Sequence, residues 1–208
     1  MIKTLIRWIP LIQGYKLNTD GSSIGNPGKS GTGGIIRDTK GEWIVGFVGN
    51  LHLANNIRAE LTALIQGLKL ALSRGLMPLE INTDCKELMN IIINDHPSYS
   101  NMLLDCRDLL RRLGSPQIHH SFRETNRVAD ALAREGSKTV QDNSFLCLDV
   151  PPLFVLDALE ADKEGTFFVR LQKPILAPNV CNSYNSAEYS LTLLSERTAL
   201  PIPCNDAY

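Results

Sequence analysis

A strand, a glycine-rich turn and a returning strand near the start of the chain constrain the fold more than any other feature. Residues 15–20 (YKLNTD) alternate apolar and polar side chains, which is typical of a half-buried strand. Residues 25–28 (GNPG) are a strong turn signal, and residues 31–38 predict the returning strand. We expect the first strand to end at Gly21, which places the carboxylate of Asp20 at a strand end beside the glycine-rich loop.

After this hairpin the hydrophobic pattern switches between the two-residue repeat of strands and the 3.6-residue repeat of helices. The strongest helix pattern begins after the N-cap candidates Asn55 and Asn56 and ends at Gly75. The other predicted elements are strands at 42–49, 79–84 and 117–122, helices at 86–93 and 99–113, and a last helix from Asn126 to Gly136. The order β-β-β-α-β-α-α-β-α predicts an α/β fold, a mixed five-stranded sheet with helices on both faces.

The length of 208 residues is enough for one domain and for two at most. We expect a loosely packed leader at 1–13, a main domain at 14–138 and a partly ordered C-terminal extension at 139–172. Within the extension, the apolar residues at 145–159 predict a short helix. Residues 173–208 are rich in Pro, Asn and Ser without periodicity, and this composition predicts a disordered tail.

Composition and charge argue against several classes of protein. The five cysteines are scattered without a C-x-x-C pair, which argues against a zinc site or disulfide framework and favours a reducing, intracellular compartment. No apolar run approaches membrane-spanning length, and charges interrupt residues 1–10, so we expect neither a membrane partner nor a secretory signal. The net charge of −1 does not by itself indicate a nucleic-acid partner, and we expect a monomer.

Four carboxylates occupy positions where α/β proteins build functional sites. Asp20 and Asp84 end predicted strands, whereas Glu60 and Asp130 lie in the first turns of predicted helices. Sites in α/β sheets gather beyond strand ends, where helices begin. Clustered carboxylates repel one another unless cations neutralise them, and oxygen ligands favour Mg²⁺ or Mn²⁺ over zinc. Two such ions about 3.5–4 Å apart are a common arrangement for hydrolysing a phosphodiester.

Each of these acids also has an ordinary structural explanation. Asp84 and Glu87 fit a helix capping box, and Asp130 can pair with Arg134 one turn further along its helix. The helix macrodipole favours Glu60 near a helix N-terminus, and an acid before a glycine is common in turns. The coincidence of all four acids at one predicted location favours a shared site.

The motifs around the four acids resemble those of type-1 ribonuclease H. The matching segments, in chain order, are TDGS at 19–22 with GNPG at 25–28, NIRAEL at 56–61, TD at 83–84 and NRVAD at 126–130. The flanking segments RWIP at 7–10 and FRETN at 122–126 are similar to those of the retroelement-derived ribonuclease H-like domains common in plant genomes. This resemblance implies the ribonuclease H fold over about residues 15–136.

The resemblance also implies a reaction, endonucleolytic hydrolysis of the RNA strand of an RNA–DNA hybrid with two Mg²⁺ ions, for which Mn²⁺ can substitute. The implied products carry 5′-phosphate and 3′-hydroxyl ends. Carried over residue by residue, the implied catalytic metal ligands are Asp20, Glu60, Asp84 and Asp130. The implied contacts to the minor groove of the hybrid, where 2′-hydroxyls mark RNA, are Gly21, Ser22, Asn26 and Asn56.

Two departures from the family leave alternatives open. His120 falls near the spacing of the mobile histidine of many members, but it lies inside a predicted strand, so it is either auxiliary to catalysis or an ordinary strand residue. The basic protrusion of some members is absent, and the nearest substitute, a row formed by Arg107, Arg111 and Arg112, is also typical of a solvated helix face. We therefore expect weak, steeply salt-dependent hybrid binding. The alternatives are a catalytically weak or inactive nucleic-acid-binding or interaction module and, less favoured, an exonuclease-like or integrase-like enzyme.

Overall fold

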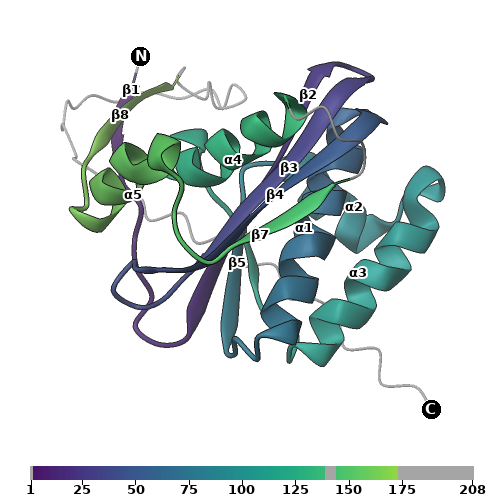
Figure 1. The fold of residues 1–208 in the computed structure, drawn as a ribbon, viewed down its shortest axis with the longest axis horizontal. Coiled ribbons are helices and arrows are strands. Elements are labelled where there is room, and N and C mark those ends of the chain that lie inside the picture. The colour runs from purple at the N-terminus through teal and green to yellow at the C-terminus, as the bar shows by residue number, and fades with distance from the viewer. Residues whose placement is uncertain (1, 139–143, 173–208) are drawn as a thin grey trace, which may run out of the picture.

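A six-stranded mixed sheet with helices on both faces forms the body of the molecule (Figure 1). The computed structural model describes residues 2–138 and 144–172, so the predicted tail lies outside the described residues. The strands, in spatial order, are β6 (Ile118–His120), β5 (Leu79–Thr83), β2 (Tyr15–Gly25), β3 (Gly28–Arg37), β4 (Trp43–Ala54) and β7 (Phe145–Leu148). Strand β2 runs parallel to β5 and antiparallel to β3, which makes the sheet mixed as predicted.

Two hydrophobic clusters attach the helices to the sheet, one on each face. The larger cluster joins Leu17, Phe47 and Ile81 of the sheet to the helices α1 (Asn56–Ser73), α2 (Lys86–Asn94) and α3 (Ser100–Arg112). The smaller cluster joins Ile35 to α4 (Arg127–Lys138), α5 (Leu156–Lys163) and the short 3-10 turn η3 (Leu153–Val155). Two further 3-10 turns are η1 (Pro97–Tyr99) and η2 (Arg123–Thr125). Within the described ranges, no helix combines the length and apolar character needed to cross a bilayer.

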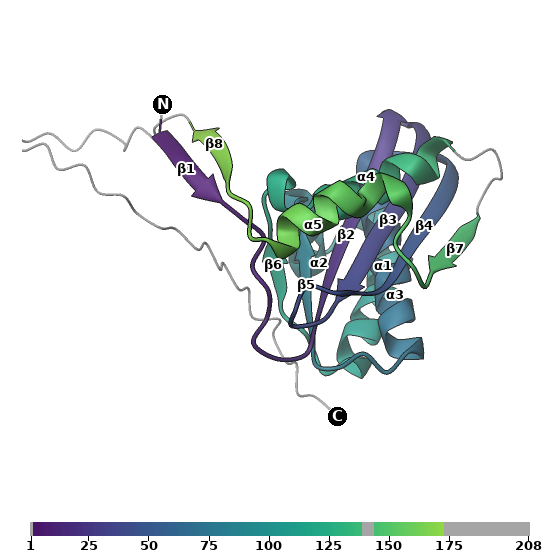
Figure 2. The ribbon, with the colours of Figure 1, turned by 60° about the vertical axis from the view of Figure 1, so that its left-hand side comes forward.

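The two ends of the described chain form a ribbon of their own. Strand β1 (Ile2–Ile6) pairs antiparallel with β8 (Phe168–Gln172), and Figure 2 shows this ribbon beside α5, apart from the main sheet. The prediction of a loosely packed leader at 1–13 was wrong, because β1 is paired and Trp8 is buried. Trp8 covers the guanidinium of Arg37, whose carbon lies 3.9 Å from the centre of the indole ring. The predicted boundaries of the main domain at 14–138 and of the extension at 139–172 are not tested by these contacts.

The five predicted strands are adjacent in the sheet, and the structure adds a sixth strand, β7, at the edge beside β4. The ring of Phe145 in β7 packs 5.6 Å from the ring of Phe47. The extension contains a short helix, α5, but this helix overlaps only the end of the segment 145–159 where it was expected, and β7 occupies the beginning of that segment.

The prediction that β2 ends at Gly21 was wrong. Strand β2 pairs with β3 as far as Gly25, opposite Gly28. Gly21 is required for a different reason, since a Cβ atom there would lie 2.3 Å from the backbone nitrogen of Glu60. The missing side chain therefore lets β2 contact the beginning of α1 directly.

Two glycines in β3 hold α4, and with it Asp130, close to the sheet. A Cβ atom on Gly33 would lie 2.2 Å from the backbone nitrogen of Ala133, and one on Gly31 would lie 2.2 Å from the Ala133 carbonyl oxygen. Gly33→Ala should lower the free energy of unfolding by about 2 kcal/mol or more, because backbone must move to admit the methyl group. Urea denaturation measures this loss.

A matched control for Gly33→Ala is Gly67→Ala in the interior of α1. The nearest atoms there are the terminal methyl carbons of Leu17, at 2.9 Å, which can rotate away. Alanine is also favoured over glycine within a helix by about 0.5–1 kcal/mol. We expect Gly67→Ala to stay within about 1 kcal/mol of the natural chain, and equal losses in the two variants would contradict the backbone-contact explanation.

Candidate active site

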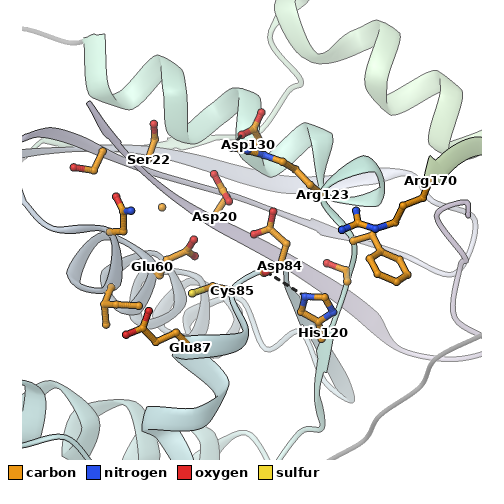
Figure 3. Close-up of a pocket in the computed structure, with 16 residues that line it drawn as sticks. Asp20, Ser22, Glu60, Asp84, Cys85, Glu87, His120, Arg123, Asp130 and Arg170 are labelled. Atoms are coloured by element: carbon orange, nitrogen blue, oxygen red, sulfur yellow. Dashed lines mark hydrogen bonds and ion pairs between the residues drawn. The ribbon is translucent and has the colours of Figure 1, made fainter. Parts of the chain in front are cut away.

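The end of the parallel strand pair defines the position of the site. The β2–β5 pairing stops at Thr19 opposite Thr83, so the residues that follow, Asp20 and Asp84, leave the pair side by side. Glu60 belongs to α1, whose backbone packs directly against β2 because Gly21 has no side chain. Figure 3 shows the carboxylates of these three residues facing one another. The convergence expected at this edge of the sheet is therefore observed for three of the four acids.

The three carboxylates form a compact and largely buried cluster. One oxygen atom from each of Asp20, Glu60 and Asp84 lies within 4.8 Å of the other two. Asp20 is 5% exposed and Glu60 is 7% exposed. The Oε2 atom of Glu60 is buried without a hydrogen-bond partner among the described residues. Burying a carboxylate oxygen without a hydrogen-bond partner costs folding free energy. A bound cation would supply the missing partner, so the arrangement is consistent with a set of cation ligands.

Burial and mutual repulsion oppose ionisation of the cluster. The pKa of Asp20 is well above its usual value, because the group is buried and because Glu60, Asp84 and Asp130 are close by. Burial, followed by the charge of Asp84, likewise raises the pKa of Glu60, although the backbone N–H of Gly21 donates to its carboxylate and opposes the rise. Burial also raises the pKa of Asp84. A divalent cation would reverse this balance by stabilising the ionised forms.

The metal-free protein should lose stability as the pH rises, and Asp20→Asn should remove part of that loss. A carboxyl group with a raised folded-state pKa keeps its proton in the folded protein after the unfolded chain has released it, above about pH 4. Unfolding then becomes more favourable with increasing pH until the folded protein also ionises. In EDTA, urea denaturation should show Asp20→Asn to be the more stable protein at neutral pH, with the difference closing near pH 4. Parallel pH profiles would contradict this prediction.

Asp130 lies in the same pocket but outside the compact cluster. Its position in the first turn of α4 is as predicted, and its Oδ2 atom accepts from Arg134 at 3.0 Å, which confirms the ion pair offered as the structural alternative. Its Oδ1 atom accepts from Arg123 at 3.3 Å. The side chain nevertheless lines the pocket with the other acids. The predicted role of Asp130 as a metal ligand therefore remains a prediction.

Two structural alternatives for the other acids fail. The N-cap of α2 is Cys85, whose Sγ atom accepts from the backbone of Leu88 at 3.4 Å, so Asp84 is not the cap of a capping box. Helix α1 begins at Asn56, which places Glu60 just beyond the first turn, where the macrodipole has less effect. Neither Asp84 nor Glu60 thus has a capping role that explains its position.

All but one of the other predicted site residues line a pocket of about 500 Å³. Gly21, Ser22, Asn56 and His120 line it together with the acids. Asn26 does not line it, but its side-chain oxygen accepts from the backbone N–H of Asn56 at 3.2 Å and so positions that residue. The predicted contacts of Gly21, Ser22, Asn26 and Asn56 with substrate remain predictions.

His120 ends β6 and lies next to the acid cluster. Its Nε2 atom is 3.2 Å from the backbone carbonyl oxygen of Asp84 (Figure 3). Burial, followed by the charge of Lys86, lowers the pKa of His120, so the ring is mainly neutral at pH 7. The structure therefore places His120 within the pocket, and both of its proposed roles stay open.

The basic groups at the pocket differ from those expected. The predicted row of arginines on α3 forms ion pairs with nearby aspartates. Arg107 pairs with Asp95, and both Arg111 and Arg112 lie close to Asp108. None of these three arginines is among the residues described as lining the pocket, which instead include Arg123 and Arg170. Sequence reasoning missed Arg170 because it lies 40 positions after Asp130, in a segment without a motif.

The segment that builds this pocket also determines the family. Residues 18–136, more than half of the chain, match the model of a family described as reverse transcriptase-like. The chain belongs to this ribonuclease H-like family. All four predicted acids fall within the matched residues, whereas the ribbon that carries Arg170 falls outside them.

Two curated relatives of this ribonuclease H-like chain have corresponding names. An Arabidopsis thaliana protein provisionally named a ribonuclease H protein is 33% identical over 136 residues, or 64% of this chain and 22% of that protein. Ribonuclease HI of Halobacterium salinarum is 32% identical over 120 residues, or 56% of this chain and 60% of that enzyme. The chain thus spans less than two thirds of either relative.

Solved structures confirm the predicted ribonuclease H fold. The crystal structure of Halobacterium salinarum ribonuclease H1 superposes with a TM-score of 0.56 at 28% identity, covering 59% of this chain and 96% of that chain. A ribonuclease H1 isolated from compost, crystallised in complex with an RNA/DNA hybrid, gives a TM-score of 0.55 at 25% identity, with coverage of 58% and 94%.

Proposed function

We propose that this ribonuclease H-like domain hydrolyses the RNA strand of RNA–DNA hybrids with the help of two Mg²⁺ ions, for which Mn²⁺ can substitute. The observation that carries the proposal is the buried cluster of Asp20, Glu60 and Asp84, whose oxygens lie within 4.8 Å of one another. The unpaired Oε2 atom of Glu60 fits a metal ligand. The relative crystallised with an RNA/DNA hybrid supports the choice of substrate.

The ligands in this proposal are the three clustered carboxylates, with Asp130, which lines the same pocket, as a fourth. The oxygen-only donor set suits Mg²⁺ or Mn²⁺. When bound, the ions supply an activated water and charge stabilisation at the leaving oxygen. The chain itself contributes the placement of these ligands, through the end of the β2–β5 pair and the close contact of Gly21 with α1.

Minor-groove recognition is the proposed task of the residues beside the acids. Gly21, Ser22 and Asn56 line the same pocket, and the Asn26 side chain holds the backbone of Asn56. A minor groove of A-like form is wide and shallow, so backbone and short side chains can reach its 2′-hydroxyls. Discrimination of RNA from DNA would arise at these contacts.

A substrate panel tests the proposed function. The full chain is incubated in Mg²⁺ with an RNA–DNA hybrid, double-stranded RNA and double-stranded DNA, each labelled on one strand. We expect cleavage of the RNA strand of the hybrid alone, products with 5′-phosphate ends and no cleavage in EDTA. Cutting of double-stranded DNA at a comparable rate would instead favour an integrase-like or exonuclease-like enzyme.

One observation favours a second candidate, a hybrid-binding module without turnover. Asp130 is engaged by both Arg123 and Arg134, and these cations compete with a metal ion for its carboxylate. Calorimetric titration with Mg²⁺ distinguishes the candidates. Binding at millimolar Mg²⁺ supports the nuclease, and hybrid binding without detectable Mg²⁺ binding supports the module.

A further inference from the structure

Two arginines enter the acid pocket from outside the elements that carry the acid cluster. Arg123 belongs to η2, which precedes α4, and Arg170 belongs to β8 of the terminal ribbon. Both line the pocket, and Figure 3 shows Arg170 on the side of the pocket where His120 lies.

Arg170 is held in place from two directions. Its Nη1 atom donates to both carboxylate oxygens of Glu124, at 3.0 and 2.7 Å, and its guanidinium carbon lies 4.5 Å from the centre of the Phe122 ring. In the ribbon, Arg170 pairs with Thr4 of β1, so its backbone is also fixed. A planar guanidinium has five N–H donors, and the contacts with Glu124 use only Nη1. The contacts with Glu124 therefore leave the Nε and Nη2 donors of Arg170, which lines the pocket, for an anion.

Arg123 has a similar surplus of donors. Its Nη2 atom donates to Asp130 at 3.3 Å, while its side chain remains 68% exposed, compared with 34% for Arg170. Its guanidinium keeps its positive charge at any pH at which a protein folds. Arginine is the side chain best matched to phosphate, because its donors form a rigid, weakly hydrated fork.

We propose that Arg123 and Arg170 bind a backbone phosphate of the nucleic acid beside the position where the acid cluster acts. This inference rests on the proposed function, and it adds a substrate contact from the terminal ribbon, which lies outside the family match at 18–136. The two cations, called the arginine pair below, take the place of the missing basic protrusion. The ribbon thereby becomes part of the nucleic-acid interface.

A purely structural role for Arg170, fastening the ribbon to Glu124, makes different predictions from phosphate binding. Arg170→Gln removes both the ion pair and the phosphate contact, whereas Glu124→Gln removes the ion pair and keeps the cation. Arg74→Gln is a charge-matched control, because Arg74 forms an exposed ion pair with Asp149 and does not line the pocket. Thermal melts of all three variants report whether the fold is retained.

Hybrid binding by the full chain tests the arginine pair. Anisotropy of a labelled RNA–DNA hybrid is measured in Ca²⁺, a hard cation with oxygen ligands, over a series of KCl concentrations. We expect Arg170→Gln to weaken binding by about 5–10-fold at low salt and to lower the slope of log affinity against log salt by about 0.7–0.9, the value for one phosphate contact. Glu124→Gln should bind as tightly as the natural chain or more tightly, and Arg74→Gln should match the natural chain. In Mg²⁺, Arg170→Gln should raise the KM for cleavage more than it lowers kcat.

Two results would overturn the arginine pair while leaving the proposed function intact. The first is binding and salt dependence of Arg170→Gln equal to those of Arg74→Gln. The second is an equal loss in Glu124→Gln, which would show that Arg170 only fastens the ribbon. A natural chain that fails to bind the hybrid would overturn both proposals, whereas one that binds it but does not cut it in Mg²⁺ would contradict the nuclease alone.

Discussion

Asp20→Asn is expected to lower the rate of hybrid cleavage by on the order of 10³-fold or more, while leaving the protein folded and more stable without metal. The change keeps the shape of the side chain but removes its charge, and a loss of this size corresponds to about 4 kcal/mol of transition-state stabilisation. The asparagine avoids the cost of burying a carboxylate and the repulsion from Glu60 and Asp84, so the change should stabilise the metal-free fold. Greater stability of the metal-free variant combined with lost activity is what we expect if the carboxylates destabilise the fold until a cation binds them.

Single-turnover cleavage of a hybrid labelled on its RNA strand measures this effect. Glu87→Gln is the matched control, because Glu87 lines the same pocket and is exposed but does not belong to the compact cluster. We expect the control to retain activity within a few-fold. Undiminished cleavage by Asp20→Asn, or an equal loss in both variants, would show that the cluster does not hold the reacting centre.

The second large effect concerns the C-terminal extension, where Asp162→Ala should lower the free energy of unfolding by about 3–5 kcal/mol. Asp162 of α5 accepts from Arg37 Nη1 at 2.7 Å, and both side chains are only 1% exposed. Removing the carboxylate leaves a guanidinium buried beneath Trp8 without its counter-charge. Loss of one partner of a buried ion pair is far more destabilising than loss of an exposed pair.

This ion pair also connects the extension to the site. The Nη2 atom of Arg37 donates to Asn18 at 2.7 Å, Asn18 donates to Asn126 at 3.1 Å, and Asn126 donates to the carbonyl oxygen of Thr19 at 2.9 Å. Thr19 immediately precedes Asp20, so a continuous chain of buried hydrogen bonds runs from α5 to the acid cluster. Asp162→Ala should therefore reduce cleavage as well as stability.

Denaturation by urea compares Asp162→Ala with Asp157→Ala, an exposed acid on the same helix. The control should stay within about 1 kcal/mol of the natural chain. A truncated chain that ends at residue 138 should also be less stable, because it lacks both Asp162 and the apolar residues of η3 and α5 that pack against Ile35. Equal stability of the two aspartate variants would mean that the extension contributes little to the main sheet.

Local patterns were sufficient to predict the acids, since each belongs to a strand end or a helix start with its own periodicity. Asp20 and Asp84 were expected to be neighbours only if their strands lay side by side, and the structure pairs these two strands in parallel. The extension of β2 beyond Gly21 was missed because glycines were taken as a turn, although close approach of α1 to the backbone requires one of them.

Contacts between distant segments could not be predicted in this way. Arg37 follows two consecutive isoleucines at the end of its strand, a position compatible with an exposed charge, and its burial depends on Asp162, 125 residues later. Arg170 reaches the pocket because β8 pairs with β1, and nothing in either five-residue strand specifies that partner. Strand β7 was missed because four apolar residues fit a strand and a buried helix equally well.

Anomalous diffraction from crystals of the full chain grown with millimolar Mn²⁺ tests the central claim, that the acid pocket is a divalent-cation site, most directly. The account predicts an anomalous peak bounded by the carboxylates of Asp20, Glu60 and Asp84, and loss of that peak in Asp20→Asn crystals. A map without a peak among these three carboxylates, from crystals in which the pocket is open to solvent, would contradict it.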